Sequence, residues 1–272
     1  MFLPTDVVDY ILSFVQSDIT TLDTCSRSHP TLSKLSERYI YAKVTLHNDN
    51  CIVNPDGLTK EISKFAQIIA KNPNIAKHVR NLKVYVDNID PKKYKATAAY
   101  LNNVASMLPT FSQLKKITLS GFGRGSCMSW HTLPVTFCQA FQCLLRVQCI
   151  DVSILYAHFL PLSLLNDCRT LRLTLHFCLD IQYDKGSIED QPYQPLEHLC
   201  IQYCYEEMEK ITSWVQLRSS RSLRVTLDEE SEFKDFLPQL LAACSSTLIK
   251  LDLDIAQLCM FTSVEFHFFQ AD

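Results

Sequence analysis

A short pattern of the form L-x-x-L-x-L recurs along most of this chain and restricts the folds that it can adopt. A clear copy is Leu114-Lys-Lys-Ile117-Thr-Leu119. Its last three residues alternate between apolar and polar, as in a strand with one buried and one exposed face. The copies begin at Val79, Leu114, Val147, Cys168, Leu196, Ser220 and Leu248.

Between these runs the apolar residues lie three or four positions apart, as on one face of a helix. We expect helices over 58–71, 96–108, 133–145, 206–217 and 232–244, and a shorter apolar turn near 159–166. A strand and a helix that recur roughly every 20 to 35 residues are typical of a solenoid, and L-x-x-L-x-L is the motif of the leucine-rich repeat. The expected fold is therefore α/β, with an irregular leucine-rich-repeat solenoid that has parallel strands on its concave face and helices outside.

An ordinary parallel α/β sheet is the alternative, because its crossover helices give the same alternation of strand and helix. Parallel strands that are buried on both faces read as continuous apolar runs. The strands of this chain alternate instead, as in Leu196-Glu-His-Leu199-Cys-Ile201. The alternation favours the solenoid. Val264 to Phe269 could form one more strand, and since solenoids normally end in a polar cap, we expect the last repeat to be incomplete or to pair with another molecule.

The first 46 residues have a different texture and predict short helices. From Pro4 to Gln16 the apolar residues span an arc of roughly 200° around a helix. A helix that covers one core needs a stripe of only about 100°. We therefore expect this first helix to be buried on two sides. Asp18 is expected to cap a second helix, a third should run from Pro30 to Tyr41, and Lys43 to Leu46 could be a strand. The expected domains are 1–46 and 47–272.

Composition limits the partners that this chain can have. Its formal net charge of −3 is close to neutral, which argues against nucleic acid or an anionic membrane as the main partner. Only 5 glycines occur, and the cluster at Gly121 to Ser126 lacks both common phosphate-binding patterns, so a nucleotide-binding site is not expected. No stretch of about 20 residues is free of polar breaks, so no membrane-spanning helix is expected.

The 12 cysteines are expected to be reduced. Residues 1–18 contain no Lys or Arg, so they lack the basic start of a secretory signal. Cysteines of proteins that are not secreted usually serve as small core residues. We expect an intracellular protein of the cytoplasm or nucleus.

Several residues of the N-terminal helices form a recognisable pattern. They are Leu3-Pro4, Ile11-Leu12 and Phe14, then Leu22, Cys25 and Arg27, and finally Leu32 and Arg38-Tyr39-Ile40-Tyr41. This pattern resembles an F-box, and its closest variety is the fungal one with a Cys-x-Arg-Ser segment. The remainder of the chain resembles the irregular leucine-rich repeats that often follow an F-box.

The resemblance implies a role as substrate-recognition subunit of a Skp–cullin–F-box ubiquitin ligase. In that family the F-box docks on a Skp-family adaptor, and through it on a cullin–RING ligase, while the repeats hold the target protein. The receptor itself performs no bond chemistry and contributes proximity. Some of the residues expected at or behind the adaptor interface must instead pack the module internally, and the sequence does not divide them. The residues are Leu3, Pro4, Val8, Ile11, Leu12, Val15, Leu22 and Cys25.

The concave sheet is the expected target-binding face. Within each strand the Leu-type positions turn inward, so the residues between them face outward. Charges of both signs are mixed along this face, which suits a polar protein partner. The candidate residues are Lys83, Tyr85, Lys116, Thr118, Asp151, Arg172, His198, Gln202, Arg224, Lys250, Asp252 and Asp254.

No metal, cofactor or catalytic residue is expected. His198, Cys200 and Cys204 lie close together, but a structural zinc site needs four convergent ligands and no second pair is evident. We expect a protein that is not an enzyme. Two alternatives stay open: a leucine-rich-repeat scaffold that recruits no ligase, and an enzyme with a cysteine nucleophile.

Overall fold

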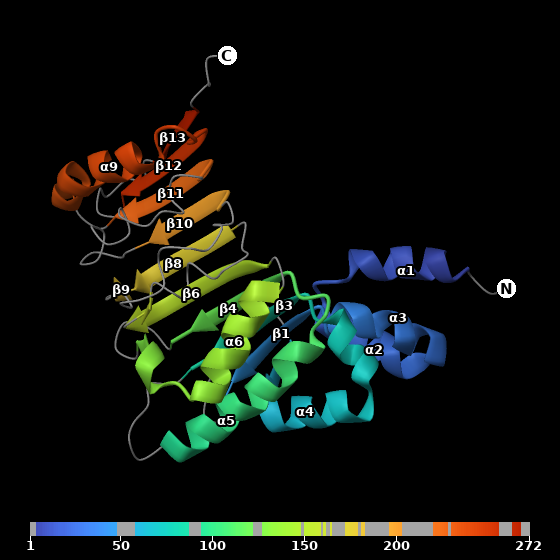
Figure 1. Cartoon of the computed structure of the whole chain (residues 1–272). Helices are drawn as coiled ribbons and strands as arrows, with labels where there is room; N and C mark the ends of the chain where they lie inside the picture. Colours follow the sequence, from blue (N-terminus) through green and yellow to red (C-terminus); the bar gives the residue numbers. More distant parts are fainter. Residues whose placement is uncertain are drawn as a thin grey trace.

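The computed structural model places three helices before a long sheet whose strands are mainly parallel (Figure 1). The chain is thus of mixed α/β architecture. The structure describes residues 4–47, 58–86, 94–121, 127–147, 150–158, 160–161, 164, 172–178, 181–182, 196–202, 220–227, 230–255 and 263–267.

The three N-terminal helices are α1 (Thr5–Phe14), α2 (Ile19–Ser28) and α3 (Pro30–Ile40). The predicted cap of the second helix is confirmed, because the Thr21 amide donates to Asp18 Oδ1 at 3.0 Å. The Thr21 hydroxyl donates to the same carboxylate, and these bonds lower the pKa of Asp18. The cap therefore contributes stability above the ordinary pKa of this carboxyl and loses it as the pH falls. Helix α1 starts after Pro4 without a side-chain cap.

Eleven strands form the main sheet, in the order β13-β12-β11-β10-β8-β6-β4-β3-β1-β2, with β5 beside β6. Apart from β2, which pairs with the outer edge of β1, the order from β1 to β12 follows the chain, and these neighbours are all parallel. The strands are β1 (Lys43–His47), β2 (Leu58–Glu61), β3 (Asn81–Tyr85), β4 (Lys116–Ser120), β5 (Met128–Ser129), β6 (Asp151–His158), β8 (Arg172–Cys178), β10 (His198–Gln202), β11 (Ser222–Leu227), β12 (Lys250–Ile255) and β13 (Ser263–His267). A separate pair joins β7 (Leu160–Pro161) to β9 (Ile181–Gln182).

The pairing register brings the apolar strand residues into rows that cross the sheet. One row contains Val44, Leu82, Ile117, Val152, Leu173, Leu199, Leu223 and Leu251, each beside the next. In the repeats that begin at Val147 and Cys168, the sequence pattern places Ile150 and Leu171 in this row. In the structure Val152 and Leu173, two residues further along the chain, take these places. The face that points inward is unchanged by this shift, because side chains alternate with a period of two.

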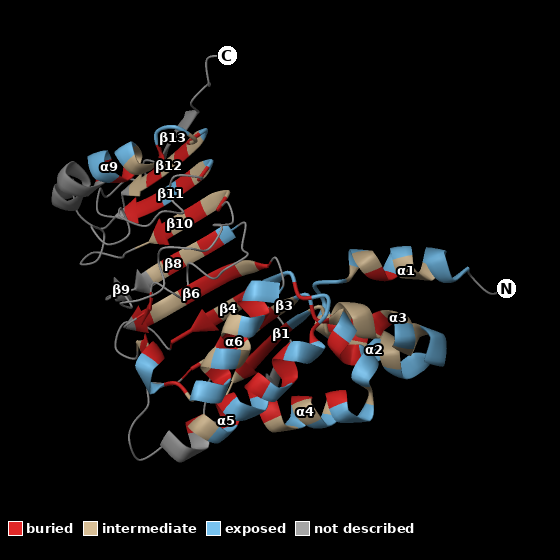
Figure 2. Ribbon diagram, in the orientation of Figure 1, coloured by how far each residue is buried: buried red, intermediate tan, exposed pale blue. Residues whose placement is uncertain are grey.

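Four helices of the described chain pack on the inward face of the sheet: α4 (Ile62–Lys71), α5 (Tyr94–Met107), α6 (Val135–Val147) and α9 (Glu230–Cys244). Their apolar residues, among them Phe65, Phe141 and Leu240, are buried in one cluster with the inward strand residues (Figure 2). Short 3₁₀ turns at Pro73–His78, Leu108–Thr110 and Trp130–Thr132 complete the connections.

Four of the predicted helices are confirmed to within two residues, except at the start of the first of them. Residues 58–61 form the edge strand β2, not the first turn of a helix, because they pair with the free edge of β1. The expected C-terminal strand is found at Ser263–His267, but it runs antiparallel to β12. The helix expected over 206–217 and most of the turn near 159–166 lie outside the described residues.

Only Tyr41 and Ala42 separate α3 from β1. The Tyr41 ring lies 6.3 Å from the ring of Phe65 and packs against both the helical core and the sheet core. The carbonyl of Ala42 accepts hydrogen bonds from the amides of Arg80 and Asn81, at 3.0 and 2.9 Å. The helical module is thus joined to the sheet directly, without a linker.

Replacing Phe111 by alanine should strongly destabilise the sheet body. Phe111 is fully buried and its ring stacks on Phe65 at 6.4 Å. We expect Phe111→Ala to lower the free energy of unfolding by about 3–5 kcal/mol, through lost burial and the cavity that remains. Urea unfolding measures this change. Phe14→Ala is the matched control, because Phe14 is 69% exposed and should change stability by less than about 0.5 kcal/mol. Equal losses in the two variants would contradict this core assignment.

Candidate functional site

Helix α1 has an inner face that packs on its own module. Leu12 forms a small core with Leu22 of α2 and Ile40 of α3, and each is at most 8% exposed. Val8 and Val15 are half-buried against the same core. This side of the wide apolar arc is therefore used inside the protein.

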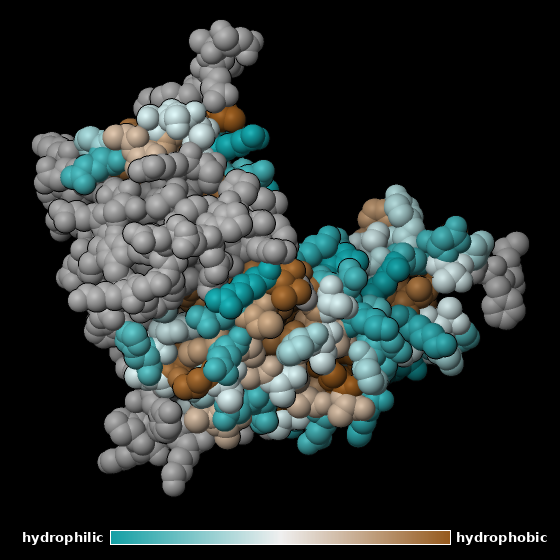
Figure 3. Space-filling view, viewed as in Figure 1, coloured by the Kyte–Doolittle hydropathy of each residue, from teal (hydrophilic) through white to brown (hydrophobic). Residues whose placement is uncertain are grey.

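The other side of the arc is exposed. Val7, Tyr10, Ile11 and Phe14 are 39%, 65%, 50% and 69% exposed, respectively. Their spacing of i, i+3, i+4 and i+7 places them on one face of the helix. The rings of Tyr10 and Phe14 meet edge to face, with their centroids 4.8 Å apart. We call these four residues the apolar stripe. Figure 3 shows hydrophobic patches among hydrophilic residues on this part of the surface.

A polar contact fixes α1 on α3. Asp9 forms an ion pair with Arg38, and the Tyr39 hydroxyl lies 3.1 Å from Asp9 Oδ1 and 3.2 Å from the Asp9 carbonyl. Arg38 also lies over the Tyr39 ring, 5.0 Å from its centre. These contacts set the rotation of α1, so the apolar stripe points away from the module.

The structure divides the eight residues that the sequence suggested for an adaptor interface. Leu12 and Leu22 are buried and belong to the core behind the surface, not to the surface itself. Val8, Val15 and Cys25 are half-buried, whereas Pro4 and Ile11 are exposed. Leu3 lies outside the described residues.

Three residues of the apolar stripe are missing from the sequence-based selection. Val7, Tyr10 and Phe14 lie in the same apolar arc as the selected ones. Helical spacing could have grouped them with Ile11. It could not tell which part of the arc faces α3, because that depends on the contact of Asp9 with Arg38.

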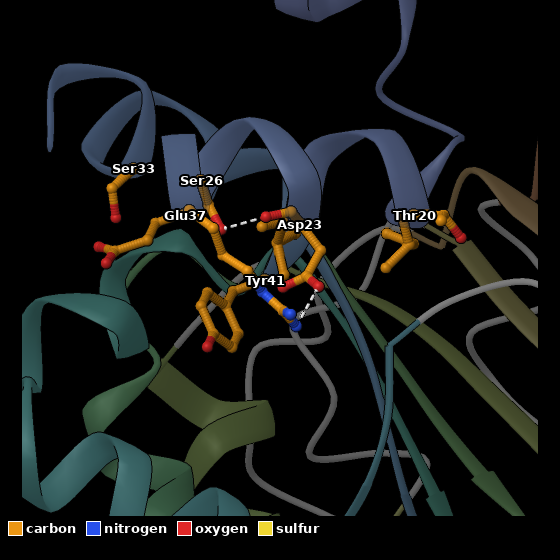
Figure 4. Close-up of a pocket in the computed structure, with 9 residues that line it drawn as sticks. Thr20, Asp23, Ser26, Ser33, Glu37 and Tyr41 are labelled. Atoms are coloured by element: carbon orange, nitrogen blue, oxygen red, sulfur yellow. Dashed lines mark hydrogen bonds and ion pairs between the residues drawn. The ribbon is translucent and has the colours of Figure 1, made fainter. Parts of the chain in front are cut away.

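A pocket of about 390 Å³ lies beside α2 and α3 (Figure 4). Two of its charged residues, Asp23 and Arg27, form an ion pair with each other. Tyr41 lines it as well, and burial together with the charges of Glu37 and Asp23 raises the pKa of its hydroxyl. Most of the residues that line the pocket are polar. Its full lining is Ile19, Thr20, Asp23, Ser26, Arg27, Ser33, Glu37, Ile40 and Tyr41.

The twelve sheet residues suggested as a binding face all lie on described strands. The register brings them onto the face opposite the helix-packed core, in rows such as Lys83–Thr118 and Arg224–Asp252. Lys116, Arg172 and Arg224 are exposed and the other nine are half-buried. His176 Nδ1 and Gln202 Oε1, on adjacent strands of this face, are 2.8 Å apart.

The described ranges contain no candidate metal site, and most of their thiols are partly or fully buried. Within them no group of three or more His, Cys, Asp or Glu residues could hold a metal ion, and Cys204 lies outside them. Burial raises the pKa of the Cys138 and Cys244 thiols to about 11 and that of Cys127 above its usual value. These thiols are protonated at neutral pH. Every helix in the same ranges is too short or too polar to cross a bilayer.

No family model matches this sequence, and neither a curated protein nor a solved structure matches it.

Neutralising Asp9 should loosen α1 without unfolding the sheet. In Asp9→Asn the ion pair with Arg38 is lost, which should cost about 1 kcal/mol for this partly exposed pair and its hydrogen bond. Hydrogen exchange should become faster in α1 and stay unchanged in β3 and β4. Asp6→Asn on the same helix is the control, since Asp6 is exposed. Unchanged exchange in Asp9→Asn would show that this contact does not anchor the helix.

The described cysteines should differ in their rate of alkylation. Cys143 is exposed, whereas Cys244 is fully buried and the pKa of its thiol is about 11. Because the thiolate is the reactive form, iodoacetamide at pH 8 should modify Cys143 at least about tenfold faster than Cys244. Mass spectrometry of digested samples measures both rates. Fast modification of Cys244 would indicate an activated thiol and would revive a cysteine-based enzyme.

Proposed function

We propose that this chain is a substrate receptor of a Skp–cullin–F-box ubiquitin ligase. In this proposal residues 1–46 are an F-box-like helical module and residues 47–272 an irregular leucine-rich-repeat solenoid. The module binds a Skp-family adaptor, and the sheet binds the protein that is to be ubiquitinated.

The apolar stripe of α1 is the observation that carries the proposal. Four large apolar side chains on one helix face are exposed, although the opposite face of the same helix already has a core of its own. Isolated apolar residues on a surface are ordinary, but a contiguous helix face of this kind is typical of a site for another protein. The stripe is therefore the surface that the adaptor would cover.

The strand order supports the solenoid. In a doubly wound sheet the strand order reverses at a switch point, and helices cover both faces. Here the order reverses only at the edge strand β2, which pairs with the outer side of β1, and it follows the chain through β1, β3, β4, β6, β8, β10, β11 and β12. In the described chain α4, α5, α6 and α9 share one core with the inward face. The opposite face carries alternating polar residues, such as Lys83, Thr118 and Asp252, which could contact a partner.

The proposed receptor acts by position. Holding a target protein near the ubiquitin-loaded enzyme raises its effective concentration, and no residue of the receptor takes part in bond formation. An interaction scaffold with the same repeats but no ligase is the alternative, and it would not need the apolar stripe.

Placing a charge in the stripe should abolish adaptor binding. Burying an Ile or Phe side chain is worth about 1.5–3 kcal/mol, and an aspartate would in addition have to lose its water. We expect Ile11→Asp and Phe14→Asp each to reduce binding of a purified Skp-family adaptor at least about tenfold, measured by calorimetry.

Val135→Asp on α6 is the matched control, because Val135 is 69% exposed but lies on the sheet body. It should bind the adaptor like the wild type. Leu12→Asp is unsuitable as a test, since Leu12 is buried and its replacement would disrupt the module itself. If the wild-type chain does not bind the adaptor, the ligase proposal is wrong and the scaffold remains.

A further inference from the structure

The hydrogen bonds of the sheet align the residues that begin its strands. The carbonyl of Arg80, just before β3, accepts from the amides of Lys115 and Lys116 at 2.7 and 3.0 Å. The carbonyl of Arg221, just before β11, accepts from the amides of Ile249 and Lys250 in the same way. The first residue of each strand, and the one before it, therefore form a continuous edge along the amino ends of the strands.

This edge is rich in exposed positive charge. Only two acidic side chains of the described chain, Asp151 and Glu197, occupy these positions, and both are half-buried. This excess of basic over acidic side chains is local, because the whole chain has a net charge of −3. We call the exposed basic residues at these positions the basic edge: Lys43, Arg80, Lys115, Lys116, Arg172 and Arg221.

The sequence alone conceals this segregation. Taken strand by strand, the outward residues carry both signs of charge, as Lys250, Asp252 and Asp254 do within β12. The register sorts them by depth along the strands: Lys250 lies beside Ser222 at the amino end, and Asp254 beside Thr226 further along. In β12 the basic residue is thus at the amino end of the strand, and the acidic residues lie further along it.

The basic edge has the dimensions of an extended peptide. Neighbouring strands are about 4.8 Å apart, so the path from β1 to β11 is about 30 Å long. An extended segment of about nine residues covers that length. In Figure 1 the amino ends of β8 to β12 face the open side next to the helical module.

We propose that the basic edge binds an acidic, extended segment of a partner protein. Charge complementarity favours that occupant, since carboxylates spaced along a peptide can pair with successive Lys and Arg side chains. A single-stranded nucleic acid fits less well, because its bases need aromatic stacking platforms. The strand-start positions in the described part carry no Phe, Tyr or Trp. The inference deepens the proposed receptor role by naming the chemistry of the captured protein, and it rests on that role only for calling the partner a ligase substrate.

Direct binding of a synthetic peptide tests the proposal without any adaptor. The probe is a fluorescein-labelled twelve-residue peptide in which Glu alternates with Ser, and fluorescence anisotropy reports its binding to the full chain. We expect saturable binding that weakens as salt rises, because exposed ion pairs are screened. In Arg80→Glu/Lys115→Glu the affinity should fall at least about tenfold.

A control with the same charge change separates a local site from net charge. Lys34→Glu/Lys71→Glu alters two exposed lysines on α3 and α4 that do not occupy strand-start positions, and should bind the peptide like the wild type. If the charge-reversed variant does not fold, Arg80→Gln/Lys115→Gln takes its place. Circular dichroism checks that this neutral variant is folded, and its affinity for the peptide should also be lower than that of the wild type.

Three results would overturn the proposal. They are no saturable binding to the wild type, an equal loss in the Lys34/Lys71 control, and tighter binding of a labelled oligonucleotide than of the peptide. Because no adaptor is present, these results are independent of whether α1 recruits a ligase.

Discussion

Backbone hydrogen bonds between parallel neighbours hold Leu82, Ile117, Val152 and Leu173 side by side, and the rest of the structure depends on this alignment. Each strand is only a few residues long and could not bury its apolar side by itself. Stacked in register, the strands present one apolar surface on which α4, α5, α6 and α9 pack. The same hydrogen bonds bring the residues of the outward face into rows. The backbone pairing therefore arranges both the apolar core and the polar face.

Much of this arrangement could be predicted because its signal is local. The alternation in Asn81-Leu82-Lys83-Val84 identifies both the strand and its buried face without knowledge of its neighbours. The exact partner of each residue could not be predicted. Val152 and not Ile150 pairs with Ile117, and a shift of two residues leaves the apolar pattern unchanged. Strand β2 was missed for a related reason: Leu58 to Glu61 is a strand only because the edge of β1 is open to it.

In the helical module, too, the sequence pattern could not identify which residues of α1 are buried. Helical spacing gave an apolar arc that was too wide for one core and predicted burial on two sides, but within this chain only the side with Leu12 is buried. Which residue belongs to which side is decided by α3, through the contacts of Asp9 with Arg38 and Tyr39. These residues are polar and thirty positions apart in the chain, so no pattern of apolar residues contains this information. Leu12 and Ile11 are neighbours in the sequence, yet one is buried and the other is half exposed.

The junction at Tyr41 and Ala42 has a geometric consequence. Because the Tyr41 ring is packed into both cores and Ala42 is bonded to the start of β3, α3 has no hinge about which to swing against the sheet. In the proposed assembly the adaptor would cover α1 and the captured protein would lie along the sheet of the same body. The distance between the two partners would then be fixed by the fold of the receptor, and would not vary as it does across a flexible linker.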